Sequence, residues 1–511
     1  MAAHESDGCG GLDRLTHRKP LLAAMRDASP IIVWFRQDLR LGDNPALVAA
    51  VATGHPIIPL YILDDATPAK WRMGAASRWW LHGSLAALAQ AFSSRGRTSA
   101  SRPTLVLRRG DAIQILPQLV AETQARGVYW NRCYEPHAVR RDRHIKETLL
   151  REGIEAKSFN ASLLFEPWTV KTGSGTPFRV FTAFWRACAP LPVEAPLPPP
   201  GDIKGIGDGS PAGDALADWR LLPRPDWASG LRATWQPGEA NAEAQLQRFL
   251  DDGIAGYRDN RDHPSLRGTS RLSPHLQFGE IGPRQIRHAV ELHQHAKGNT
   301  QDAETFLKEI GWREFSYHLL FHFPALPESP LRPGFADFPW RKDPEALRAW
   351  QRGQTGYPIV DAGMRELWAT GWMHNRVRMI VASFLVKDLL LPWQTGEAWF
   401  WDTLVDADLA NNSASWQWVA GCGADAAPYF RIFNPVLQGE RFDPDGDYIR
   451  RWVPELATLP KAVIHAPWNA SPAILSDNGV SLGRDYPLPI VDHGAARDRA
   501  LAAFAALKKR R

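Results

Sequence analysis

The chain contains 511 residues, of which 44% are hydrophobic and 23% are charged. This length exceeds what one hydrophobic core usually supports, so at least two domains are expected, and the composition excludes collagen-like and wholly disordered proteins. The 60 Lys and Arg residues and the 55 Asp and Glu residues leave a net charge of +5, which permits a polyanionic partner without indicating one. Tryptophan is unusually abundant, because 22 Trp residues stand beside 21 Phe and 9 Tyr.

Cysteine spacing and apolar runs bear on the compartment of the protein. The 4 cysteines are scattered without CxxC or other metal-ligand spacing, so neither a disulfide framework nor a metal site is predicted. The first thirty residues carry charges throughout and are not typical of a secretory signal. No apolar run approaches the roughly eighteen residues needed to cross a bilayer. We therefore expect a cytoplasmic protein without a membrane partner.

Short apolar runs alternate with helical sequence in the first third of the chain. The runs Pro30–Phe35, Ile57–Ile62, Thr104–Leu107 and Gly127–Trp130 are typical of strands, whereas Ser77–Phe92 is typical of a helix. This alternation predicts an α/β domain with a Rossmann-like parallel sheet and helices on both faces. No G-x-G-x-x-G follows the first run, so this domain need not hold the main cofactor.

A proline-rich segment separates this domain from a second one. Between Ala189 and Gly238 the prolines and a Gly/Asp-rich stretch predict an extended connector. Beyond Glu239, windows such as Ala303–Leu320, Ile359–Leu390 and Ala398–Trp418 carry apolar residues at helical spacing, which predicts an all-α C-terminal domain. The predicted division is an N-terminal extension (1–29), an α/β domain (30–160), a connector (161–238), a helical domain (239–492) and a C-terminal tail (493–511).

Two polar segments near residue 260 suit an anionic ligand. Tyr257 begins a Tyr-Arg-Asp-Asn-Arg sequence that ends at Arg261, and the segment 269–273 (Thr-Ser-Arg-Leu-Ser) precedes Pro274 at a predicted helix start. Hydroxyls and backbone amides in that arrangement can bind a phosphate. The alternative is an N-cap followed by a turn, which the residue types alone favour by about two to one.

A second segment places three kinds of side chain on one helical face. Glu309, Trp312 and Arg313 stand at positions i, i+3 and i+4, so a carboxylate, a large aromatic surface and a cation lie side by side. Such a face could stack on a base and hydrogen-bond its edge. The ordinary alternative, again favoured by about two to one, is a core Trp312 with a surface pair of Glu309 and Arg313.

Two later segments repeat this mixture of polar and aromatic residues. Asn375, Arg378 and Met379 share a helical face, and Arg378 is a natural partner for Asp406 or Asp408, although ordinary helix packing would use the same residues. His374 is assigned no role, because an isolated histidine is more often structural. Further along, Trp416 and Trp418 lie two residues apart, so their rings should point to different sides, one to a cofactor and one to a cavity.

Together these segments resemble the photolyase/cryptochrome family, and within it the bacterial photolyases that repair cyclobutane pyrimidine dimers. Three further segments carry the same resemblance: 165–168 (Phe-Glu-Pro-Trp), 174–178 (Ser-Gly-Thr-Pro-Phe) and 181–185 (Phe-Thr-Ala-Phe-Trp). The resemblance extends from about Pro30 to about Asp492. It implies an antenna-type α/β domain, a connector, and a helical catalytic domain that binds DNA and holds FAD in a U shape, reduced and anionic in the active form.

The family's functional positions can be carried over residue by residue. The Arg378–Asp406 pair would lie beside the isoalloxazine, with Asn412 at its N5. The residues implied for FAD are Tyr257, Thr269, Ser270, Arg271, Leu272, Ser273, Phe306, Arg378, Asp406, Asp408 and Asn412. The lesion pocket would comprise Glu309, Trp312, Asn375, Met379 and Trp418, and DNA would contact Arg261, Arg313, Arg376, Arg431 and Gln438. An electron chain would run through Trp416, Trp393 and Trp340, all of which could alternatively be core residues.

The implied activity is that of a deoxyribodipyrimidine photo-lyase, with UV-damaged DNA as the partner. Photolyases act on bases taken out of the stack, so the lesion must be extruded from the duplex. Excited reduced FAD would donate an electron to the dimer and recover it after the ring splits, while Glu309 stabilises the developing charge. Phosphate contacts would give affinity with little sequence preference. A monomer without an obligate protein partner is expected.

Three other functions are weighed against this one. A cryptochrome-type photoreceptor is disfavoured by Asn412, where plant cryptochromes carry Asp, and by the lack of a long low-complexity tail after Asp492. A six-four photolyase would need histidines where Asn375 and Met379 stand, and a flavin oxidoreductase lacks its nicotinamide fingerprint.

The antenna chromophore stays open. The family's pterin-binding pattern is not matched at Gly42 or at His137 and Ala138. Methenyltetrahydrofolate, a deazaflavin or no second chromophore are therefore all compatible with the sequence.

Overall fold

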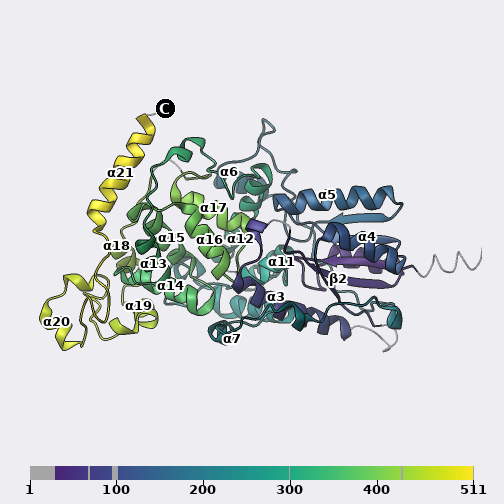
Figure 1. The fold of residues 1–511 in the computed structure, drawn as a ribbon, viewed down its shortest axis with the longest axis horizontal. Coiled ribbons are helices and arrows are strands. Elements are labelled where there is room, and N and C mark those ends of the chain that lie inside the picture. The colour runs from purple at the N-terminus through teal and green to yellow at the C-terminus, as the bar shows by residue number, and fades with distance from the viewer. Residues whose placement is uncertain (1–28, 67–68, 95–101, 299, 427–429, 510–511) are drawn as a thin grey trace, which may run out of the picture.

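The structure is a computed structural model that describes residues 29–66, 69–94, 102–298, 300–426 and 430–509. The predicted N-terminal extension, except for its last residue, lies outside the described residues. An α/β domain and a larger helical domain lie side by side, at the right and the left of Figure 1. Among the described helices, none is long and apolar enough to span a bilayer.

The α/β domain is built on a five-stranded parallel sheet in the order β3-β2-β1-β4-β5. The four predicted strands are confirmed, with β1 fully buried because it is apolar on both faces. The fifth strand was not predicted, because its Glu-Ala-Lys-Ser-Phe sequence is largely polar, as an edge strand tolerates. The strands are β1 (Ile31–Phe35), β2 (Ile57–Leu63), β3 (Val106–Arg109), β4 (Gly127–Asn131) and β5 (Glu155–Phe159).

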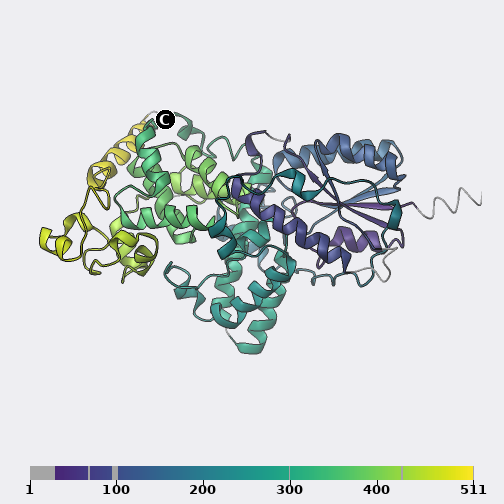
Figure 2. The ribbon, with the colours of Figure 1, turned by 60° about the horizontal axis from the view of Figure 1, so that its bottom comes forward.

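Helices cover both faces of this sheet, as predicted (Figure 2). Successive residues of a strand point to opposite faces, so Ile31 and Val33 join one core and Ile32 and Trp34 join the other. The helices α2 (Pro45–Val51) and α3 (Ala75–Ser93) cover the first face, and α4 (Ala112–Thr123) and α5 (Pro136–Arg151) cover the second.

The connector contains only short helices between extended segments, α6 (Phe181–Cys188) and α7 (Ser229–Thr234) with two 3₁₀ turns. Its extended part runs back along the α/β domain, because Asp43 donates its backbone N–H to the carbonyl oxygen of Leu197 and Ile57 donates to that of Lys204. The connector thus ties the two domains together along their length.

The second domain is all-α, as predicted, because the described residues beyond 239 form no strand. Two five-residue π-helical turns, 249–253 and 384–388, interrupt the helices. The helices are α8 (Glu239–Arg248), α9 (Tyr257–Asn260), α10 (Ser273–Gln277), α11 (Pro283–Lys297), α12 (Thr300–His322), α13 (Pro344–Arg352), α14 (Pro358–Thr370), α15 (Asn375–Ser383), α16 (Trp393–Thr403), α17 (Leu409–Ala420), α18 (Pro435–Phe442), α19 (Asp447–Trp452), α20 (Pro472–Asp477) and α21 (His493–Lys509).

Two of the predicted helical windows contain breaks that matter for the site. The window 359–390 is interrupted at Gly371, whose φ of 68° ends α14, and His374 accepts the Arg376 N–H to start α15. The window 398–418 is interrupted by the segment 404–408, and Asp408 caps α17. Both breaks bring charged side chains to helix ends in the interior of the domain.

The last helix corrects one predicted boundary. Residues 493–511 were expected to form a tail, yet α21 packs on the helical domain with Ala500 buried. Phe504 stacks on Phe430 at a ring-centroid distance of 4.4 Å, and His493 lies 2.6 Å from the Asp388 carboxylate. The helical domain therefore extends through α21.

A buried carboxylate joins the two domains. Glu280 precedes α11 and is completely buried, and it accepts hydrogen bonds from Trp80 and Ser84 on α3 of the other domain. The Gly238 N–H donates to the same carboxylate, which His275 also contacts. Because every partner is a donor or a histidine, this buried charge is satisfied and fixes how the domains meet.

Candidate active site

An ion pair lies where α15 approaches the start of α17. Arg378 Nη2 donates to both Asp406 carboxylate oxygens, at 2.8 and 3.1 Å, and its Nε donates to the Met373 carbonyl oxygen at 2.7 Å. The structure thus selects Asp406 over Asp408 as the partner of Arg378. Asp408 instead caps α17 and accepts the Tyr317 hydroxyl at 2.5 Å, and burial raises the pKa of its carboxyl.

Asn412 is held from behind by α16. Its Nδ2 donates to the Glu397 carbonyl oxygen at 3.0 Å, which leaves Oδ1 as the amide atom that a ligand can meet. The Glu397 side chain accepts the Ser413 hydroxyl at 2.5 Å, and burial raises the pKa of Glu397 to about 8. This carboxyl was missed by the sequence interpretation, because a single Glu in an apolar helix gives no signal of its own.

The segment 269–273 does not cap α10. The N-cap of this helix is Leu272, whose side chain makes no capping hydrogen bond, so the N-cap interpretation is wrong. Ser270 Oγ instead accepts the Leu272 N–H at 3.4 Å within the turn that precedes the helix. Arg271 has a φ of 53°, and its guanidinium lies 4.6 and 4.7 Å from the ring centroids of Trp235 and Trp372. Its buried Nε has no hydrogen-bond partner among the described residues. Ser273 is exposed and accepts the Trp372 Nε1–H, while Thr269 and Ser270 are half-buried.

Two residues predicted to contact the cofactor form an aromatic corner. Tyr257 on α9 and Phe306 on α12 meet edge to face with their ring centroids 5.4 Å apart, and Phe249 contacts both. All three are buried. Burial raises the pKa of the Tyr257 hydroxyl, so this group stays neutral.

A network of two acids and two arginines connects α9, α12 and α15. Arg261 Nη1 donates to Glu309 at 2.6 Å, and Arg376 Nη2 lies 2.8 Å from Asp262. Glu309 therefore pairs with Arg261 and not with Arg313. Burial raises the pKa of the Glu309 carboxyl, although the neighbouring Arg261 opposes this shift. Asp262, which the sequence interpretation missed, directly follows Arg261 and could have been recognised by that adjacency.

The structure corrects the prediction that Arg313 contacts DNA. Its Nη1 donates to the Ser162 carbonyl oxygen at 2.6 Å, and its guanidinium lies 4.8 Å from the Tyr317 ring centroid. Only 10% of the side chain is exposed. Arg313 therefore anchors the segment around Ser162 to α12 and does not present its charge at the surface.

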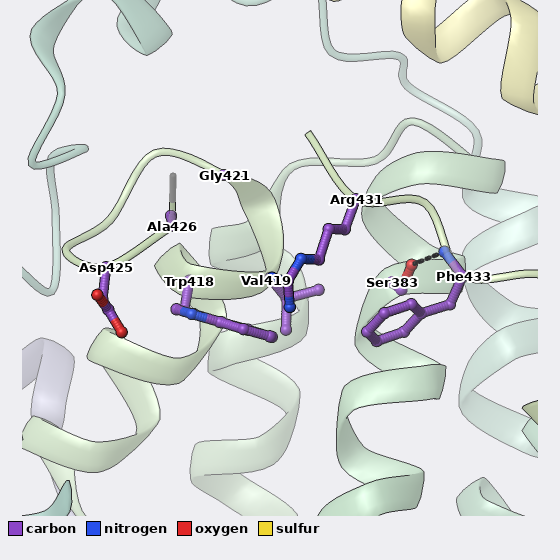
Figure 3. Close-up of a pocket in the computed structure, with 8 residues that line it drawn as sticks. All are labelled: Ser383, Trp418, Val419, Gly421, Asp425, Ala426, Arg431 and Phe433. Atoms are coloured by element: carbon purple, nitrogen blue, oxygen red, sulfur yellow. Dashed lines mark hydrogen bonds between the residues drawn. The ribbon is translucent and has the colours of Figure 1, made fainter. Parts of the chain in front are cut away.

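The remaining residues predicted for the lesion pocket lie at accessible positions. Trp312 is half-buried and stacks on Phe181 with ring centroids 3.7 Å apart, whereas Asn375 is exposed and Met379 is half-buried on the first turns of α15. Trp418 lines a small pocket with the exposed Arg431, whose guanidinium lies 5.9 Å from the ring centroid (Figure 3). Gln438 is half-buried on α18.

The three tryptophans predicted for electron transfer range from the core to the surface. Trp416 and Trp393 are buried, and Trp340 is half-buried with its ring centroid 4.4 Å from that of Phe338. Trp416 lies against Gly396, where a Cβ would stand 2.1 Å from the indole ring. Gly396 was a signal for this contact that the sequence interpretation did not use, since a glycine inside a helix usually marks close packing.

These features define a two-domain α/β and all-α protein whose helical domain gathers cations, hydroxyls and aromatic rings around one region. Residues 31–201 match the family model described as DNA photolyase, and residues 306–506 match the FAD binding domain of DNA photolyase. The chain belongs to the DNA photolyase/cryptochrome family.

Individual relatives agree with this assignment. A deoxyribodipyrimidine photo-lyase of Agrobacterium fabrum is 52% identical over 94% of this chain and 98% of its own length. Cryptochrome-1 of Arabidopsis thaliana is 43% identical over 92% of this chain and 69% of its own length. The crystal structure of a bacterial class III photolyase from Agrobacterium tumefaciens superimposes with a TM-score of 0.90 over 94% of this chain and 98% of that one. The comparisons favour a DNA-repair photolyase over a cryptochrome.

The residues present fit FAD as the resident cofactor. Arg271 offers a buried Nε that lacks a partner among the described side chains, next to the hydroxyls of Thr269, Ser270 and Ser273, and this donor set suits a diphosphate. For the flavin ring of the cofactor, the Arg378–Asp406 pair and the Asn412 amide offer both donors and acceptors to its polar edge.

Proposed function

We propose that this protein is a light-driven DNA lyase that splits cyclobutane pyrimidine dimers, with the cofactor site and the lesion site adjoining on three helices. One observation carries the proposal. On α12, Phe306 from the cofactor set precedes Glu309 from the lesion set by three residues, and α15 carries Arg378 between Asn375 and Met379. Because α12 and α15 both pack on α17, a flavin and a lesion bound by these residues would be neighbours.

In this proposal FAD is held by three groups of residues. Its diphosphate and ribityl chain meet Tyr257 and the segment 269–273, and its ring edge meets Arg378 and Asp406, with Asp408 close by. Asn412 would present Oδ1 to the flavin N5, and Phe306 would pack on the cofactor. When bound, reduced FAD supplies light absorption and an electron for the lesion. The protein residues orient it and keep water from the ring through the buried walls of α16 and α17.

The lesion is recognised outside the stacked duplex. Trp312 and Trp418 offer aromatic surfaces on which extruded bases can stack, and Asn375 and Met379 complete the pocket. Glu309 hydrogen-bonds the damaged bases and stabilises the negative charge that develops on them. DNA phosphates contact Arg261, Arg376, Arg431 and Gln438, so binding should weaken with rising salt and depend little on sequence.

We further propose that the protein acts as a monomer in the cytoplasm, without an obligate protein partner. The buried, unpaired state of Cys133, Cys188 and Cys422 is compatible with a reducing compartment. Size-exclusion chromatography with light scattering should give a mass near 57.1 kDa. A concentration-independent dimer would contradict this part of the proposal.

The function is tested by illuminating anaerobically reduced protein with an oligonucleotide that contains one cyclobutane thymine dimer. Loss of the dimer under blue light, and none in the dark, is the expected result. The undamaged oligonucleotide should remain unchanged in both conditions. Dimers that stay intact after saturating illumination would refute the repair function.

Replacing Trp340 by phenylalanine should separate photoreduction from repair. Indole is far more easily oxidised than a phenyl ring, so photoreduction of the oxidised flavin should slow, whereas repair by chemically reduced protein should persist. Trp368→Phe is the matched control, because Trp368 is 67% exposed on α14 outside the proposed chain. Both rates can be followed by flavin absorption and by dimer loss. Equal loss of both activities in Trp340→Phe would mean that Trp340 is structural.

A further inference from the structure

The network around Glu309 contains one hydrogen bond, from Arg261 to Glu309, for which a DNA phosphate can compete. In the free protein Arg261 Nη1 donates to Glu309 Oε1 at 2.6 Å, and this is the shortest polar contact of the network. The same guanidinium lies 3.9 Å from Asp262 through its Nε. Arg261 is thus the main cation beside the carboxylate that is proposed to act on the lesion.

The partners of this bond are reachable from solvent. The side chains of Arg261 and Glu309 are 23% and 27% exposed, so solvent reaches both groups. A guanidinium binds phosphate in the same bidentate manner as carboxylate, and it cannot give up its proton to either. A phosphate that takes the Nη1–H of Arg261 competes with Glu309 for that donor, whereas a phosphate bound only through Nε and Nη2 would leave the Glu309 contact in place.

Resting on the proposed function, we infer that a DNA phosphate displaces Glu309 from Arg261, so that Glu309 is freed and takes up a proton from solvent when dimer-containing DNA binds in the dark. Arg261 then acts as a positioning residue whose charge favours the Glu309 carboxylate until substrate is present. The step forms one O–H bond on Glu309 and consumes one solvent proton. No electron moves and no other bond changes.

The charges around Glu309 determine the direction of this proton transfer. Arg261 and Arg376 favour the carboxylate, whereas burial and the nearby Asp262 disfavour it. Neutralising Arg261 with a phosphate removes the largest favourable contribution, and a lesion seated in the pocket removes water, so the Glu309 pKa rises further on binding. Protonation follows because a neutral carboxyl can donate to a base carbonyl oxygen, whereas a carboxylate can only accept.

Asp262 differs from Glu309 in the cation that it contacts. Arg376 Nη2 lies 2.8 Å from Asp262, and its guanidinium is held 4.3 Å from the ring centroid of Phe442. Asp262 retains this cation where the phosphate contact proposed for Arg376 is made through donors other than Nη2, and the Asp262→Asn variant tests that condition. This difference between two neighbouring acids provides the matched control for the experiment.

The experiment is a calorimetric titration of the dark, flavin-loaded protein with a dimer-containing oligonucleotide, in two buffers of equal pH and different ionisation enthalpy. The difference between the two binding enthalpies gives the number of protons taken up. In a series of titrations at different pH, the wild-type protein should take up a substantial fraction of one proton per bound dimer at the pH where the uptake is greatest. Glu309→Gln should bind without uptake, and Asp262→Asn should retain it. Arg261→Gln should bind more weakly and with reduced uptake, because its Glu309 has no cation to lose.

Several outcomes would overturn the inference while leaving the repair function intact. These are binding by the wild-type protein without proton uptake, undiminished uptake in Glu309→Gln, and undiminished uptake in Arg261→Gln, which would attribute the proton to burial alone. If Asp262→Asn lost the uptake and Glu309→Gln kept it, the proton would bind Asp262 and not Glu309. Failure of the wild-type protein to bind the dimer at all would instead refute the proposed function.

Discussion

Glu397→Gln should flatten the dependence of stability on pH between about 4.5 and about 8. Glu397 is 1% exposed, and burial raises its pKa from 4.5 to about 8 in the folded protein. Within this window the folded state holds a proton that the unfolded state has lost, so the wild-type free energy of unfolding falls as pH rises through it. Integrated over the window, the loss amounts to about 5 kcal/mol. Glutamine reproduces the shape of the protonated carboxyl and cannot titrate.

Urea denaturation of both proteins at intervals from pH 5 to pH 9 measures this effect. The difference in free energy of unfolding between Glu397→Gln and wild type should increase with pH and level off above about pH 8. Glu314, whose pKa burial raises to about 7, contributes equally to both proteins and cancels in the difference. Glu345→Gln, on the exposed part of α13, is the control and should leave the profile unchanged. Parallel profiles for wild type and Glu397→Gln would show that Glu397 is ionised when folded.

The same carboxyl links stability to the proposed cofactor site. The Glu397 backbone oxygen accepts the Asn412 amide and so fixes which amide atom Asn412 can offer to a flavin, while the Glu397 side chain accepts the hydroxyl of the neighbouring Ser413. Ionisation of a side chain with so little exposure would draw water or cations towards α17. We therefore expect flavin to dissociate more readily from the wild-type protein than from Glu397→Gln at alkaline pH.

Local periodicity predicted the elements that are strongly apolar and missed what depends on distant contacts. The strands around Ile31 and Ile57 were recognised because both faces are buried, while β5 at Glu155 escaped because it is polar. The i, i+4 relation of Glu309 and Arg313 suggested a pair within the helix, yet Arg261 from α9 and Ser162 from the connector take the two side chains instead. Such partners come from tertiary structure, which spacing along one helix cannot reveal.

The Arg378–Asp406 pair shows where sequence and resemblance together succeed. Spacing alone left Asp406 and Asp408 as equal candidates. The helix break at 404–408 decides between them, because Asp408 faces back into the first turn of α17 and accepts the Asn411 N–H at 2.7 Å. A helix N-cap commits its carboxylate to backbone amides, so Asp406, just outside the helix, remains free for the arginine.

Gly396→Ala should be a strongly disruptive single-methyl change in the catalytic domain. A Cβ at this position would stand 2.1, 2.5 and 2.6 Å from three carbons of the Trp416 indole, distances that real contacts do not allow. The ring cannot retreat easily, because it is 2% exposed and packs on Phe400 and Trp350 at centroid distances of 5.0 and 6.3 Å. Overpacking of this kind costs about 3 kcal/mol, and the better helix propensity of alanine returns about 1 kcal/mol.

The net loss of about 2 kcal/mol should appear as a lower urea midpoint with an unchanged slope. Gly173→Ala is the matched control, because a Cβ there meets nothing within 4 Å, and its stability should stay within about 0.5 kcal/mol of wild type. Since Trp416 is the residue proposed to stand next to the flavin, displacement of its ring should also slow photoreduction, whereas chemically reduced Gly396→Ala should still repair dimers. If this variant kept both wild-type stability and wild-type photoreduction, α16 would have shifted to accommodate the methyl group. The close contact with Gly396 would then determine neither the position of Trp416 nor its electron transfer.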